Sequence, residues 1–158
     1  IKLKFKACRS SKGNSGLQIR SRYDDSAFWL DGPQIDINPP GPYRCGMIWD
    51  ETREVRHWIY PWIDQGKGWV TEEMAIRPVK LYYSDDEPQW NEMLVKVDGY
   101  HITCFLNNVQ VTDFEGEKIL NDPIHHKYNV GTKGHLALQI HVRDQLEIYY
   151  KDLFVREL

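Results

Sequence analysis

The chain has 158 residues, of which 41% are hydrophobic and 13% aromatic, so it is long enough for one domain with a packed core. Its net charge of −3 and its scattered lysines and arginines argue against a nucleic-acid partner. No run of about 18 apolar residues occurs, so we expect no insertion into a membrane.

The first half of the chain reads as short strands separated by strong turn signals. Residues 1–7 alternate apolar side chains with lysines, the period-two pattern of a strand with one solvent-exposed face. A glycine-bounded turn over 8–16 leads into a second strand over 17–22. Residues 27–30 fit a short strand or an aromatic lid. Residues 33–37 fit a strand that ends at the following prolines, because proline cannot donate to a sheet ladder.

The middle of the chain is less regular. Residues 44–49 read as a further strand, and 55–78 hold many aromatic residues among prolines and glycines. This composition is too aromatic for a disordered linker. We therefore expect a long ordered excursion that covers one face of the fold, with a short helical turn near 72–75. A strand is predicted over 79–83.

Three strands over 91–97, 101–106 and 109–114 form a predicted meander, because an Asp-Gly turn and an Asn-Asn turn separate them. Asp122 before Pro123 is a helix N-cap pattern, which predicts a short helix immediately after it, over 123–128. Two final strands are expected over 136–141 and 146–156. Short strands with frequent turns indicate an all-β sandwich.

The three cysteines, Cys8, Cys45 and Cys104, show no C-x-x-C spacing, and an odd number cannot pair completely. We expect buried or partly buried free thiols. One disulfide of unassigned pairing stays open as the alternative.

Several short motifs resemble one family in the same order along the chain. The first is G-N-S-G-L-Q-I-R-S at 13–21, which is similar to the NSG-x-x-x-R motif of the 3-keto-disaccharide hydrolase-like domains. The others are G-P-Q-I-D-I at 32–37, Q-W-N-E at 89–92 with L-N-N-V at 106–109, G-H-L-A-L-Q-I-H at 134–141 and K-D-L-F-V-R-E-L at 151–158. The resemblance implies a concanavalin A-like jelly roll of two antiparallel sheets. It also implies one domain over 1–158 that lacks N-terminal strands usual in the family.

The resemblance also implies a site. In the family, the positions that match Arg20, Gln34, Arg44 and His141 line one pocket. In this sequence the same residues alternate with apolar neighbours on predicted strands, so they are expected to face away from the core. Asn14 of the first motif, Trp49 and Gln139 are predicted to join them in substrate binding. Aromatic side chains of the excursion are expected either to form a small core of their own or to face a ligand.

The family's chemistry is the cleavage of 3-keto-glycosides by abstraction of the C2 proton and elimination of the C1 substituent. Such a reaction needs a base, a cation or donor at the enolate oxygen, and an acid for the leaving group. We predict His141 or Asp36 as the base, Arg20 or Arg44 at the enolate, and Glu51 as the acid. The chain departs from the family at Gly32 and Ile140, where relatives often carry Glu and Asp. Asp36, Glu51 or Glu54 are then the candidate carboxylates.

Other functions stay open. One alternative is a non-catalytic carbohydrate-binding module of a larger secreted protein, and another is a structural interaction domain. Ordinary glycoside hydrolysis needs two flanking carboxylates, whereas the amide of Gln34 stands where a sandwich glucanase would have its leading Glu. We expect a carbohydrate ligand, a secreted or periplasmic location, and further domains in a longer chain.

No histidine spacing favours a transition-metal site, and no cofactor is predicted with certainty. A structural Ca²⁺ is an option, since the loops at Asp24-Asp25 and Asp85-Asp86-Glu87 offer carboxylate oxygens.

Overall fold

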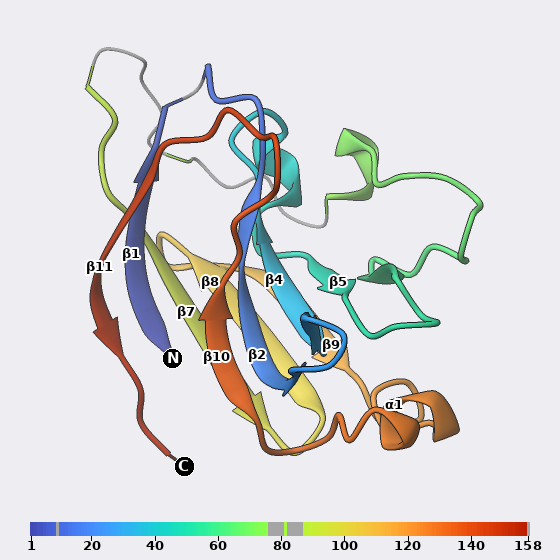
Figure 1. Cartoon of the computed structure of the whole chain (residues 1–158). Helices are drawn as coiled ribbons and strands as arrows, with labels where there is room; N and C mark the ends of the chain where they lie inside the picture. Colours follow the sequence, from blue (N-terminus) through green and yellow to red (C-terminus); the bar gives the residue numbers. More distant parts are fainter. Residues whose placement is uncertain (9, 76–80, 82–86, 158) are drawn as a thin grey trace.

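Two antiparallel sheets packed face to face make up the protein, as a computed structural model shows (Figure 1). The structure describes residues 1–8, 10–75, 81 and 87–157. One sheet has the strand order β11 (Ile148–Phe154), β1 (Lys2–Ala7), β7 (Asn91–Asp98), β8 (His101–Leu106), β9 (Val109–Glu115). The other has the order β10 (His135–Leu138), β2 (Ser15–Asp24), β4 (Pro33–Ile37), β5 (Ile48–Asp50), β6 (His57–Tyr60), with β3 (Trp29–Asp31) paired to β2.

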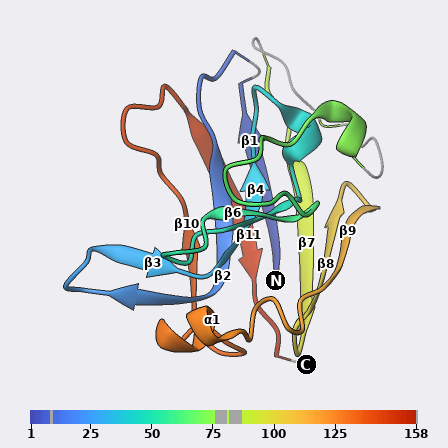
Figure 2. The ribbon, with the colours of Figure 1, turned by 90° about the vertical axis from the view of Figure 1, so that its right-hand side faces the viewer.

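The core lies between the two sheets because the period-two pattern places alternate apolar side chains on the facing surfaces. Figure 2 shows the two layers from the side, with the β2–β3 hairpin extending beyond them. Each fully buried aliphatic side chain in this core contributes roughly 1.5–3 kcal/mol to stability. The core includes Leu3, Phe5, Leu17, Ile19, Ile35, Ile37, Ile48, Met93, Val95, Ile102, Cys104 and Leu106. The predicted all-β sandwich of two antiparallel sheets is therefore confirmed.

The second half of the chain follows its sequence pattern closely. The meander β7–β8–β9 is present, and Asn107 and Asn108 at its second turn both have positive φ. The predicted helix is α1 (Pro123–Lys127), where the Asp122 carboxylate accepts hydrogen bonds from the backbone N–H groups of Ile124 and His125, both at 2.9 Å. The three cysteines are free thiols.

The strand predicted over 44–49 is wrong over its first four residues, 44–47. Pro42–Arg44 forms a 3₁₀ turn (η1), and β5 begins only at Ile48. The turn closes through hydrogen bonds from Arg44 N to Gly41 O and from Cys45 N to Pro42 O, at 2.9 and 3.1 Å. Proline at the first position of η1 favours the turn, which competes with the extended conformation that alternation suggested.

A further boundary differs from expectation, and one predicted strand is not tested. The strand predicted over 136–141 ends at Leu138, so Gln139 and His141 follow β10 rather than belonging to it. The strand predicted over 79–83 falls on residues that are, except for Leu81, outside the described part of the chain.

The aromatic excursion contains β6 and a short 3₁₀ turn, η2 (Glu72–Met74), close to the helical turn expected there. It builds a second, smaller hydrophobic core from Met47, Trp58 and Val70. Among the described residues, no helix is long and apolar enough to cross a membrane.

Candidate active site

A polar cluster lies on the face of the six-stranded sheet that is turned away from the main core. Gln18 on β2 stands opposite Gln34 on β4, and Asp36 follows two positions later on the same face of β4. These side chains alternate with the core residues of their strands, yet all three are buried. A polar face covered by other segments, rather than exposed to water, is the first unusual feature of this protein.

Asp36 is the carboxylate at the centre of this cluster, and its side chain is 1% exposed. The Asn14 Nδ2 donates to its Oδ1 at 3.1 Å, and the Arg44 Nε lies 3.7 Å from its Oδ2. Burial raises the pKa of Asp36 to about 7, although the Arg44 cation and the Asn14 amide favour the charged form. The group therefore changes protonation state near neutral pH.

Arg44 joins the cluster to the aromatic residues of the excursion. Its guanidinium lies over the ring of Trp69 at 5.2 Å and over Trp58 at 5.8 Å. Trp49 packs against both of these rings, with centroid distances of 5.5 and 5.6 Å. Trp58 is buried, whereas Trp69 is 52% exposed and offers part of its surface to solvent. The expectation of a small aromatic core is therefore confirmed, whereas a ligand-facing aromatic stays a prediction.

A chain of side-chain amides connects β4 to the segment after β5. Gln34 Nε2 donates to Gln139 Oε1 at 3.0 Å, and Gln139 Nε2 donates to Glu51 Oε1 at 3.2 Å. Gly16 permits this arrangement, since a Cβ there would lie 2.5 Å from Gln34 Cγ and Cδ. Close packing against Gln34 is therefore the reason that this position has no side chain.

Glu51 is the second carboxyl group whose burial raises its pKa, opposed mainly by the cation of Arg56. The Arg56 Nε lies 3.8 Å from Glu51 Oε2. The backbone of Glu51 is held on both sides, because its N–H donates to Gly32 O at 3.0 Å and its carbonyl accepts from the Trp29 indole at 2.9 Å. These two hydrogen bonds fix the position of the Glu51 backbone, and therefore of its Cα.

His141 lies at the exposed edge of the cluster, with its Nδ1 3.6 Å from the Asp144 Oδ2. The same Asp144 oxygen accepts a hydrogen bond from the backbone N–H of Asn14 at 3.1 Å. Gly13 is required for this contact, since a Cβ there would lie 2.5 Å from Asp144 Cβ. The charge of His141 favours the ionised form of Glu51, but burial has the larger effect and the pKa of Glu51 is still raised overall. The loop after β10 is thus fastened to the first motif of the chain.

Two candidates do not reach the cluster. The Glu54 carboxylate accepts from Lys127 and, at 2.6 Å, from the Tyr128 hydroxyl instead. Arg20 is the other. Its guanidinium donates to the backbone carbonyl groups of Gly99 and, at 3.3 Å, Val97 at the β7–β8 turn. Arg20 has a φ of 51°, at a point where three residue steps on β2 match two on β10. This β-bulge breaks the alternation on which the prediction depended.

Two buried amide oxygens in the cluster, Gln18 Oε1 and Gln34 Oε1, have no hydrogen-bond partner among the described residues. An unsatisfied buried acceptor costs roughly 1–3 kcal/mol. Arg44 Nε likewise has no partner within hydrogen-bonding distance in this part of the chain.

Comparison with protein families supplies the assignment. A model of the 3-keto-alpha-glucoside-1,2-lyase-like domain matches residues 1–156. The chain belongs to this family. A search of curated protein sequences finds no match.

Two crystal structures from Parabacteroides distasonis ATCC 8503, each described as a "putative glycosyl hydrolase", are similar to this lyase-like domain. The first has a TM-score of 0.56 at 23% identity over 96% of this chain and 73% of its own. The second has a TM-score of 0.51 at 15% identity over 97% of this chain and 70% of its own. At these identities the likeness supports the fold.

Sequence reasoning about this lyase-like domain missed Asp144, Trp69 as a particular aromatic, and the buried Gln18. No local pattern marks Asp144, whose contacts join residues 130 positions apart. Gln18 carried a usable signal, because it stands on the same face of its strand as Arg20 was expected to.

No three His, Cys, Asp or Glu side chains come together as a metal site within the described residues. In the Asp24-Asp25 loop, the Asp24 carboxylate already accepts from Ser26 and pairs with Arg53. Asp85 and Asp86, the core of the other loop considered for Ca²⁺, lie outside the described residues.

Proposed function

We propose that the Asp36–Glu51 cluster, which we define as Asn14, Gln18, Gln34, Asp36, Arg44, Glu51, Gln139 and His141, cleaves the glycosidic bond of a 3-keto-glucoside. The observation that carries the proposal is the placement of two carboxyl groups with raised pKa values beside a cation and an imidazole. Displaced pKa values on neighbouring groups are typical of sites that perform acid–base chemistry.

His141 is the proposed base. It is the group of the cluster that reaches solvent while its Nδ1 is oriented by Asp144, which leaves Nε2 to face a substrate. It removes the C2 proton, which the C3 carbonyl acidifies, and the electron pair moves into an enolate. Asp36 is buried beneath Arg44 and Asn14, so it holds these two side chains rather than touching the sugar.

Arg44 is the proposed stabiliser of the enolate oxygen, since Arg20 is engaged at the β7–β8 turn. Glu51, whose raised pKa favours the protonated form, donates its proton to the C1 oxygen as the C1–O bond breaks. The aglycone leaves as an alcohol, and the sugar keeps a C1=C2 double bond conjugated to the ketone. Addition of water, with hydroxide at C1 and a proton at C2, then gives the free 3-keto sugar.

Sugar binding is assigned to Trp69. Its half-exposed indole offers a flat apolar surface for the C–H face of a pyranose, whereas the amides of Gln18 and Gln34 are buried beneath the surface. The same features would serve a non-catalytic carbohydrate-binding module. The deep burial of Asp36 favours that second candidate, because it leaves His141 as the one proposed base with access to substrate.

Turnover separates the two candidates. The protein is incubated with 4-nitrophenyl 3-keto-glucoside and with the unoxidised glucoside, and nitrophenol release is followed. We expect release from the keto sugar alone, and its loss when His141→Ala and Asp36→Ala are combined. Binding of both sugars without release would establish the binding module, and undiminished release by the double variant would refute the role of this cluster.

A further inference from the structure

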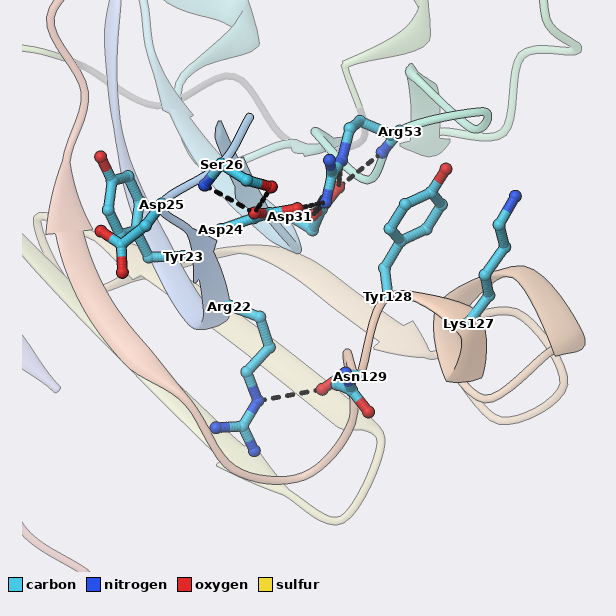
Figure 3. A pocket seen from close by; sticks show the side chains of 10 residues that line it. All are labelled: Arg22, Tyr23, Asp24, Asp25, Ser26, Asp31, Arg53, Lys127, Tyr128 and Asn129. Carbon is cyan, nitrogen blue, oxygen red and sulfur yellow. Dashed lines mark hydrogen bonds and ion pairs between the residues drawn. The ribbon is translucent and has the colours of Figure 1, made fainter. Parts of the chain in front are cut away.

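A second candidate site lies outside the Asp36–Glu51 cluster. An open pocket of about 880 Å³ is formed by the β2–β3 hairpin, the loop after β5 and the end of α1 (Figure 3). Its lining residues are Arg22, Tyr23, Asp24, Asp25, Ser26, Asp31, Arg53, Lys127, Tyr128 and Asn129. The proposed reaction uses none of them.

One wall of this pocket is a rigid ion-pair network. Asp31 is 1% exposed and accepts from Arg53 Nη2 at 2.6 Å, from its Nε at 3.1 Å and from its backbone N–H at 2.8 Å. Arg53 Nη2 also lies 2.9 Å from Asp24 Oδ2, and the guanidinium stacks on the ring of Tyr128 at 4.5 Å. Because these groups already satisfy one another, they give the pocket a defined shape but leave few bonds for a ligand.

Other lining groups are still available to a ligand. Tyr23 is 52% exposed, and neither its side chain nor that of Asp25 contacts another described residue by a hydrogen bond, ion pair or ring. Arg22 donates from Nε to the backbone carbonyl of Asn129 at 2.9 Å, which leaves its terminal nitrogens without a partner among the described residues. Figure 3 shows Tyr23 and Tyr128 on opposite sides of the pocket, with Arg22 between them below.

The charges of the lining residues limit the class of ligand. Three aspartates (Asp24, Asp25 and Asp31) face three cations (Arg22, Arg53 and Lys127), so the lining carries no net charge. Neither a polyanion nor a cation is favoured by such a field. An exposed aromatic ring suits a neutral molecule that has apolar C–H faces and many hydroxyl groups. So do a carboxylate without a partner among the described residues and a guanidinium whose terminal nitrogens have none there.

We propose that this pocket binds a neutral saccharide through the Tyr23 ring, the Asp25 carboxylate and the Arg22 guanidinium. The ring stacks on one face of a sugar unit, the carboxylate accepts from paired hydroxyl groups, and the guanidinium donates to ring or hydroxyl oxygens. The site is independent of catalysis at the Asp36–Glu51 cluster, since its ligand class follows from its own residues.

The test is a titration of the ¹⁵N-labelled chain with maltose, cellobiose, lactose and trehalose, followed by two-dimensional NMR. We expect at least one of these disaccharides to shift the backbone signals of residues 22–26, 53 and 127–129. Tyr23→Ala should weaken the affinity about tenfold, the value of one good aromatic contact. Asp25→Ala removes a side chain with no structural contact among the described residues and should weaken binding as well.

Two controls make the outcome decisive. Tyr149→Ala removes a tyrosine of similar exposure on β11, away from the pocket, and should leave the titration unchanged. His141→Gln should also bind as the unmodified chain does, which separates this proposal from the catalytic one. The proposal is overturned if none of the four sugars shifts these signals, or if Tyr23→Ala and Asp25→Ala both retain full affinity.

Discussion

Two buried aspartates on the same sheet, Asp31 and Asp36, each face an arginine, and the two pairs differ in how fully they are satisfied. Asp31 and Arg53 share three side-chain hydrogen bonds of 2.6–3.1 Å. Asp36 and Arg44 approach at one ion-pair distance of 3.7 Å. Both aspartates are 1% exposed, so burial does not distinguish them.

This difference indicates that Asp31–Arg53 stabilises the fold, whereas Asp36–Arg44 belongs to the candidate active site. Hydrogen bonds to Asp31 and Asp24 raise the pKa of Arg53 above its usual value, so the guanidinium stays charged. In the other pair, burial raises the pKa of Asp36 to about 7. A buried charge that is incompletely paired costs stability, and strongly displaced pKa values cluster at functional sites.

The largest effect is expected for the proposed base. His141→Gln should lower kcat/KM for a 3-keto-glucoside by about 10²–10⁴, because a general base contributes rate enhancement of this size. Asp31→Asn, which changes the fully hydrogen-bonded Asp31–Arg53 pair, should lose much less activity per folded molecule. Rates are measured on both variants and normalised to the folded fraction from circular dichroism. Equal losses would contradict the assignment of His141 as the base.

Asp36→Asn tests the Asp36–Arg44 pair through the pH dependence of stability. The raised pKa of Asp36 means that its ionisation opposes folding, so its contribution to stability falls as pH rises from about 4 to about 7 and is constant above. The full change amounts to roughly 4 kcal/mol for a shift from 3.8 to about 7. The free energy of unfolding, measured with urea, should fall more between pH 5 and pH 8 for the unmodified chain than for Asp36→Asn. An equal fall in both proteins would contradict the raised pKa of Asp36.

Asp31→Asn should destabilise the fold, and to a similar extent at both pH values. It leaves the Arg53 guanidinium with a weaker partner and loosens the β2–β3 hairpin, so Tm should fall by several degrees at both pH values. An unchanged Tm would show that the Asp31–Arg53 pair does not stabilise the fold.

His125 ties α1 to the sheet near the cluster. It is 1% exposed, with Nε2 2.7 Å from Asp50 Oδ2 and Nδ1 2.8 Å from Asp122 Oδ1. Burial alone would lower its pKa, but the two carboxylates raise it overall. Its stabilisation is therefore complete below about pH 6.5 and is lost as pH rises through the raised value. His125→Gln should cost about 1–3 kcal/mol at pH 6 and less at high pH, by urea unfolding; a cost that grows with pH would contradict this account.

The smallest effect is expected at the aromatic surface. Trp69→Ala should raise KM about tenfold with little change in kcat, because a stacking surface binds substrate and transition state alike. Trp62 is 55% exposed, contacts His57 rather than the cluster, and provides the matched control. Equal effects of Trp69→Ala and Trp62→Ala would remove Trp69 from the site.

The sequence predicted most strands and part of the cluster, since both depend on local alternation. Gln34 and Asp36 face away from the core because Ile35 and Ile37 face into it. Alternation failed at Arg20, where the chain bulges, and at Arg44, which a proline places in a turn. Asp144 and the Asp31–Arg53 pair depend on contacts between distant segments, which a local pattern does not contain.

The most direct test of the central claim follows the C2 hydrogen itself. A 3-keto-glucoside with deuterium at C2 is mixed with excess protein and quenched after one turnover, beside a sample without protein that corrects for spontaneous exchange. Abstraction and elimination predict that the released sugar has lost its deuterium to solvent. Release of a sugar that retains deuterium at C2 would contradict proton abstraction and indicate direct hydrolysis at C1.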